Sequence, residues 1–91
     1  MTVVNESGKI RIAPAYRIQW EETQQAYVLL YPEGMVKLNA SAGEILRHCD
    51  GSRTEADIVG TLARLYPDAD LESDVAEFLA AARTRGWVRD H

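Results

Sequence analysis

The chain has 91 residues, of which 10 are Lys or Arg and 14 are Asp or Glu, so its formal net charge is −4. This length fits one small domain with a single modest core, and the acidic balance argues against a partner held through nucleic-acid phosphates. The one cysteine, Cys49, excludes an intrachain disulfide and a cysteine-based zinc site. No apolar run approaches the roughly 20 residues of a membrane-spanning helix, and the first residues lack the pattern of a signal peptide. We therefore expect a cytoplasmic protein with no membrane partner.

The N-terminal half of the chain carries the pattern of a small sheet. Residues 1–13 are unpatterned, and we expect a flexible arm there, followed by a single domain over residues 14–91. Strand patterns then cover residues 16–21, 26–31 and 35–38. Pro32 and Gly34 form the second turn. Because both connections are short, we expect an antiparallel meander in chain order, with its first and third strands as edges.

The remainder of the chain changes to the 3.6-residue period of helices. The predicted helices span about residues 41–49, 54–66 and 71–85. Ser41 and Glu44 form the pattern of a capping box for the first helix, and Thr54 is the expected N-cap of the second. A three-stranded meander followed by three helices predicts an α+β fold that is winged helix-turn-helix-like, with the wing placed first.

Two apolar features complete the predicted core. The stripe of the second helix ends with Leu65 and Tyr66, and we expect both to be buried. Trp87 and Val88 follow Gly86, which ends the third helix, and we expect them to close back on the core.

Residues capable of catalysis are scarce. His48 and Cys49 are adjacent, and neighbours on a helix point about 100° apart, so they do not form a nucleophile–base pair. The two histidines offer no metal-ligand spacing, and no glycine-rich phosphate loop is present. We expect no catalytic residue and no metal site; an enzyme acting through Cys49 is a third hypothesis.

A winged-helix DNA-binding regulator is the alternative that the helix order motivates. The helix over residues 71–85 is its natural recognition helix. Its first turns carry Glu72, Asp74 and Glu77, which phosphates repel, while Arg83 and Arg85 lie at the far end. The sequence therefore favours no nucleic-acid partner.

Peptide capture by strand addition fits the third strand. Met35, Val36 and Leu38 make this edge apolar, and an unblocked edge offers backbone bonds to an extended peptide. The competing interpretation is an ordinary edge protected by Lys37 and by its shortness. The residues alone leave these two interpretations evenly balanced.

A resemblance covers nearly the whole chain, from about Arg11 to Val88. It is carried by Gln19-Trp20-Glu21, by the stretch Leu-Leu-Tyr-Pro-Glu-Gly-Met-Val-Lys-Leu-Asn that ends at Asn39, by Cys49-Asp50-Gly51 and by Gly86-Trp87. These blocks, with Ser41-Ala42, Glu44-Ile45-Leu46, Asp74-Val75 and Phe78-Leu79, resemble the PqqD family of pyrroloquinoline quinone (PQQ) biosynthesis, which are recognition elements for ribosomally made precursor peptides.

The resemblance implies a peptide chaperone without catalysis or cofactor. Such a protein binds the precursor peptide PqqA and presents it to the radical S-adenosylmethionine (SAM) enzyme PqqE. The peptide adds as a strand to the third strand and packs against the third helix. The implied peptide-binding residues are Met35, Val36, Lys37, Leu38, Asp74, Phe78, Ala81, Ala82 and Arg85. Phe78 and Ala82 stay open between groove and core, and the oligomeric state stays open between monomer and weak homodimer.

Overall fold

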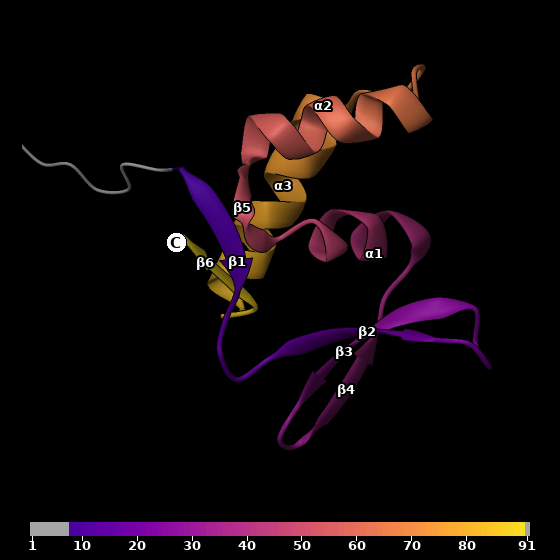
Figure 1. Cartoon of the computed structure of the whole chain (residues 1–91), viewed down its shortest axis with the longest axis vertical. Coiled ribbons are helices and arrows are strands. Elements are labelled where there is room, and N and C mark those ends of the chain that lie inside the picture. The colour runs from indigo at the N-terminus through magenta and orange to yellow at the C-terminus, as the bar shows by residue number, and fades with distance from the viewer. Residues whose placement is uncertain (1–7, 91) are drawn as a thin grey trace, which may run out of the picture.

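Residues 8–90, the part of the chain that the computed structural model describes, form six strands and three helices (Figure 1). In chain order these are β1 (Lys9–Ile12), β2 (Arg17–Glu21), β3 (Ala26–Tyr31), β4 (Gly34–Lys37), α1 (Ala40–Arg47), β5 (Asp50–Thr54), α2 (Glu55–Leu65), α3 (Leu71–Thr84) and β6 (Val88–Asp90). The expected α+β fold is confirmed.

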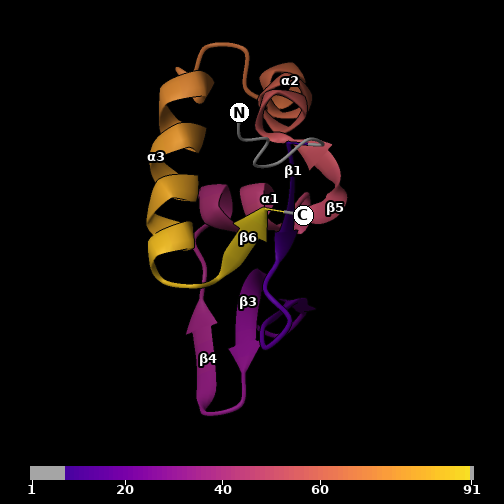
Figure 2. The ribbon, with the colours of Figure 1, turned by 90° about the vertical axis from the view of Figure 1, so that its left-hand side faces the viewer.

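The meander β2-β3-β4 is antiparallel and follows chain order, as expected. Ile18, Leu29 and Val36 stand side by side in its register and share one face. Leu29 belongs to the core and the other two pack against it, so this face is turned toward the helices. The β3-β4 hairpin extends away from the helices at one end of the molecule (Figure 2).

A second sheet, in the order β5-β1-β6, corrects the expected N-terminal arm. Residues 9–12 are β1, and Ile10 in its middle is 1% exposed. The backbone N–H of Ile12 donates to Cys49 O at 3.0 Å, and that of Ala13 donates to Trp87 O at 2.8 Å. The strand β1 was not predicted from the sequence, because it is short and its partner strands β5 and β6 lie far along the chain. Residues 1–7 of the expected arm lie outside the described residues.

The helix starts agree with the sequence at one position and differ at another. Thr54 caps α2 as expected, and its hydroxyl accepts from Asp57 N while the Asp57 carboxylate accepts from Thr54 N. In α1 the cap is Asn39, whose Oδ1 accepts from Ala42 N at 2.8 Å. The capping box expected at Ser41 is therefore wrong: Asn39, an equally good cap, comes two residues earlier.

One apolar cluster joins both sheets and all three helices. It consists of Ile10, Leu29, Leu38, Ala42, Ile45, Leu46, Cys49, Ile58, Leu62, Val75, Leu79, Ala82 and Val88. Val88 is buried and Trp87 packs against the cluster, so the predicted closure after α3 is confirmed. The expected burial of Leu65 and Tyr66 is wrong, since they are 58% and 45% exposed.

The helix α1 approaches the meander closely at Gly43, and this contact yields a stability prediction. A Cβ at Gly43 would lie 2.9 Å from Tyr27 Cδ2 and 3.1 Å from Tyr27 Cβ, whereas one at Gly60 in α2 meets nothing within 4 Å. Alanine favours a helix over glycine at both positions, but at Gly43 it overpacks the contact. We expect Gly43→Ala to lower the free energy of unfolding by about 1–3 kcal/mol.

Gly60→Ala is the matched control and should raise the free energy of unfolding by about 0.5–1 kcal/mol. Urea unfolding monitored by circular dichroism measures both values. If both variants were stabilised to the same extent, the Tyr27 side chain would shift at little energetic cost, and the prediction for Gly43→Ala would be wrong.

Candidate peptide-binding site

The register of β4 on β3 determines which backbone N–H and C=O groups of β4 point to its open edge. The Leu38 N–H donates to Tyr27 O at 3.0 Å, and the pairs continue as Lys37 with Val28, Val36 with Leu29 and Met35 with Leu30. Hydrogen-bonded and non-hydrogen-bonded pairs alternate in an antiparallel ladder. Val36 therefore bonds inward to β3, and the N–H and C=O groups of Met35 and Lys37 point away from the sheet.

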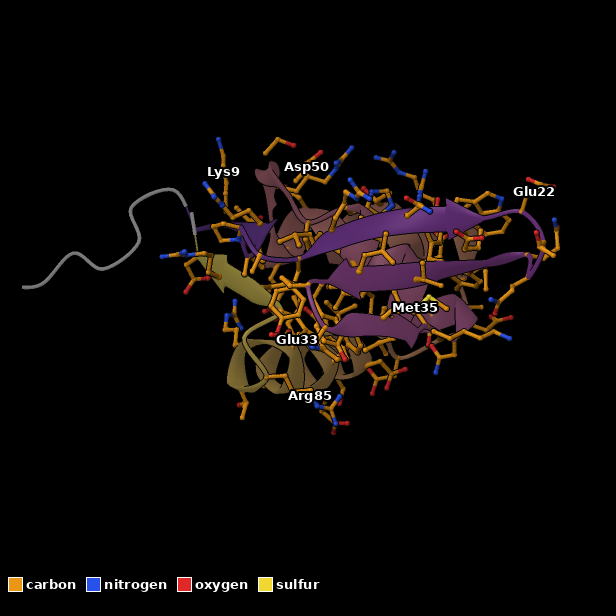
Figure 3. All side chains as sticks on the ribbon, turned by 90° about the horizontal axis from the view of Figure 1, so that it is seen from below. Lys9, Glu22, Glu33, Met35, Asp50 and Arg85 are labelled. Atoms are coloured by element: carbon orange, nitrogen blue, oxygen red, sulfur yellow. The ribbon has the colours of Figure 1, made fainter. Side chains whose placement is uncertain are left out.

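The side chains of β4 divide between the two faces of the meander. Met35, 50% exposed, lies on the outer face (Figure 3). Lys37, two residues further along the strand, is exposed on the same face. Val36 is half-buried and packs against the core, and Leu38, just after the strand, is 5% exposed. The side chain of Leu38 therefore supports this edge from within the core and offers no surface to a peptide.

The helix α3 lies on the same side of the molecule as the open edge of β4 (Figure 2). Of its candidate residues, Asp74 and Ala81 are exposed. Arg85, which follows the helix, is exposed as well, and its guanidinium carbon lies 5.1 Å from the centre of the Trp87 ring. Ala82 is 1% exposed and belongs to the core, so its side chain is not available to a peptide.

Phe78 combines the two roles that the sequence left open. It is half-buried and packs against the core cluster, and it also lines a cavity of about 320 Å³ between α1 and α3. The lining residues are Ala40, Ser41, Glu44, Ile45, Leu62, Tyr66, Ala69, Leu71, Asp74, Val75 and Phe78. Asp74 and Phe78 are thus brought together, whereas Met35 and Arg85 lie outside this cavity.

Most residues of this cavity were not predicted from the sequence as site residues. Tyr66 lines it although the helical periodicity assigned that residue to the core. A periodic stripe identifies the side of a helix that faces protein, but it does not show where two helices diverge. One feature of the sequence could have indicated the exposure of Tyr66: this residue stands at the end of its helix, directly before Pro67.

The neighbouring His48 and Cys49 are both buried and are not arranged for catalysis. The Cys49 thiol donates to Ile45 O at 3.4 Å. Burial, reinforced by the charge of Asp50, raises the pKa of this thiol to about 12. Burial also lowers the pKa of His48, and Arg47 and Arg53 add to that shift. The thiol is therefore protonated at neutral pH, the opposite of what a nucleophile requires.

The described residues contain neither a grouped set of metal ligands nor a helix of membrane-spanning type. Across residues 8–90, no three His, Cys, Asp or Glu side chains are grouped so that they could hold a metal ion. None of the helices described has the length and apolar character needed to cross a bilayer.

A solved structure defines the class to which this fold belongs. The solution NMR structure of the PqqD truncation of Methylobacterium extorquens PqqCD matches with a TM-score of 0.72 and 28% sequence identity, over 97% of this chain and 96% of that one. That protein is a functional and stand-alone recognition element for ribosomally synthesized and post-translationally modified peptides (RiPPs). The present fold is that of a RiPP recognition element.

Sequence comparisons identify the family. The model of coenzyme PQQ synthesis protein D (PqqD) matches residues 26–88. The PqqA binding protein of Azotobacter vinelandii is 48% identical over 91 residues, which cover 99% of this chain and 97% of the relative. That of Methylococcus capsulatus is 47% identical over 81 residues, with 89% and 87% covered. The chain belongs to the PqqD family.

The buried thiol yields a second prediction. We expect Cys49 to react with iodoacetamide at pH 8 only through unfolding, so the reaction should accelerate steeply with urea. The folded pKa of about 12 lies above the ordinary value of 9.0. The stability that the buried neutral thiol contributes is therefore complete below about pH 9 and is lost as the pH rises toward 12.

Cys49→Ala is the control, and its free energy of unfolding should fall less steeply over this alkaline range than that of the unsubstituted protein. Rapid alkylation of the folded protein at pH 8 would show an accessible, activated thiol and would contradict the assignment.

Proposed function

We propose that this protein is a peptide chaperone without catalytic activity, which binds the precursor peptide PqqA and presents it to the radical SAM enzyme PqqE during PQQ biosynthesis. The observation that carries the proposal is the outward backbone polarity of Met35 and Lys37 on an edge strand, in a chain whose relatives are PqqA binding proteins. An extended peptide that pairs with this edge gains backbone hydrogen bonds, and side-chain pockets next to the edge provide specificity.

In this binding mode β4 and α3 contribute different contacts. Met35 and Lys37 supply the backbone donors and acceptors, and Val36 supports the strand from the core side. The exposed side of α3, with Asp74, Phe78, Ala81 and Arg85, meets the peptide side chains. The accessible apolar surface of Met35 and the half-buried Phe78 support this assignment.

The chemistry of the pathway step belongs, in this proposal, to PqqE. The one cysteine of the chain is buried and protonated, so its thiol is not available as a nucleophile toward the peptide. Its free thiol suits the reducing cytoplasm. Glu72, Asp74 and Glu77 are exposed on the first half of α3, so this helix does not suit the phosphates of DNA.

Proline substitutions on β4 test the strand addition, because proline removes one backbone N–H. Lys37→Pro removes an outward N–H, so we expect a folded protein whose affinity for PqqA falls at least about tenfold, equivalent to roughly 1.4 kcal/mol. Val36→Pro removes an inward N–H and should destabilise the meander itself. Circular dichroism reports folding, and isothermal titration with synthetic PqqA reports binding.

The control lies on the opposite edge of the sheet. Leu29 bonds to β4, so its neighbours Val28 and Leu30 bond to β2, and Ile18 points its N–H outward. Where Ile18→Pro folds, it should bind PqqA as the unsubstituted protein does. Unchanged affinity of folded Lys37→Pro would place the peptide elsewhere. Adding PqqE to the PqqA complex in the same calorimeter tests the second partner, and no heat of binding would contradict presentation.

A further inference from the structure

The cavity between α1 and α3 combines an apolar wall with carboxylates from two different helices. Leu71 and Phe78 form part of the wall, and Tyr66 closes it at the end of α2. Glu44 projects from α1 and Asp74 from α3, and both side chains reach solvent. A volume of about 320 Å³ is at the small end for ligand sites, so the cavity suits one long side chain better than a cofactor.

We propose that this cavity holds a lysine or arginine side chain of the bound peptide, an inference that rests on the proposed function. The aliphatic stem of such a side chain lies along Leu71, Tyr66 and Phe78, and its cationic group meets Glu44 and Asp74. Lysine and arginine bury their stems on apolar surface in this way while the charged group stays near water. Charge-assisted hydrogen bonds to carboxylates then give the contact its specificity.

The charges around the cavity leave Asp74 available to a cation. Glu44 is partly compensated by Arg47, with 3.4 Å between the nitrogen and oxygen atoms, and Arg47 Nε also donates to the Tyr27 hydroxyl at 3.0 Å. No basic side chain within residues 8–90 forms an ion pair with Asp74. The N-termini of α1 and α3 add only about half a positive charge each. A cationic side chain of the peptide would supply the positive charge that balances these two carboxylates.

The position of the cavity restricts which part of the peptide enters it. Ala40 and Ser41 line it, and they follow β4 after a connection of only two residues. The cavity therefore lies beyond the C-terminal end of β4. We assign the basic residue to the peptide segment that flanks the strand paired with β4.

Calorimetric titration of synthetic PqqA at low ionic strength tests the assignment. Asp74→Asn and Glu44→Gln should each weaken binding by about three- to tenfold, and the double variant should weaken it further. The matched control is Glu72→Gln, which also removes a carboxylate from the first turn of α3 but lines a separate pocket with Glu55, Ala56 and Val59. It should bind as the unsubstituted protein does. Added salt should reduce the differences.

A second set of peptides identifies the occupant. Each lysine or arginine of PqqA is replaced in turn by methionine, which keeps the length and removes the charge. One replacement should bind the unsubstituted protein and Asp74→Asn with nearly equal affinity, because the pair no longer interacts. If every replaced peptide still distinguishes the two proteins, or if Asp74→Asn and Glu44→Gln match Glu72→Gln, the cavity does not receive a cation and the proposal is overturned.

The same measurements separate this inference from the proposed function. Loss of binding in Lys37→Pro together with unchanged binding in Asp74→Asn refutes the cation site alone. Absence of any PqqA binding by the unsubstituted protein refutes both.

Discussion

The register of β4 on β3 is the constraint on which the remainder of the proposed peptide site depends. A shift by one residue would exchange the inward and outward backbone groups and would move Val36 from the core face to the solvent face. The core packing of Val36 and Leu38 opposes that shift, because both side chains are held on the helix side. Burial of these apolar side chains thus determines which backbone N–H and C=O groups of β4 face the solvent.

The contact of α1 with Tyr27 is one of those that hold the helices on this sheet. Gly43 allows α1 to approach the Tyr27 ring, and that ring meets Trp20 at 5.0 Å between ring centres. Since α1 is held there, its first turn faces the start of α3 across the cavity. The edge, the helix flank and the cavity are therefore positioned by one packed core, and they do not need to form separately when a peptide arrives.

The sequence predicted the local features of this fold and missed those that depend on distant contacts. The meander followed from alternation and short turns, and Thr54 was recognised as a cap because its partner Asp57 lies three residues away. The strand at residues 9–12 was missed because its stabilising partners begin at Asp50 and Val88. For the candidate site, the sequence predicted the open edge of the meander but not the exposure of Tyr66, since periodicity does not distinguish the wall of a cavity from a filled core.

The pairing of β1 with β6 has a consequence for how this domain is joined to other proteins. Ile10 stands opposite Asp90, so the two ends of the described chain leave the domain side by side. Both ends are on the second sheet, away from the β3-β4 hairpin (Figure 1). The path to a protein fused at either end therefore starts at the β1-β6 pair. A covalent neighbour attached at either end would thus be held beside the second sheet at high effective concentration, whichever of the two ends carries it.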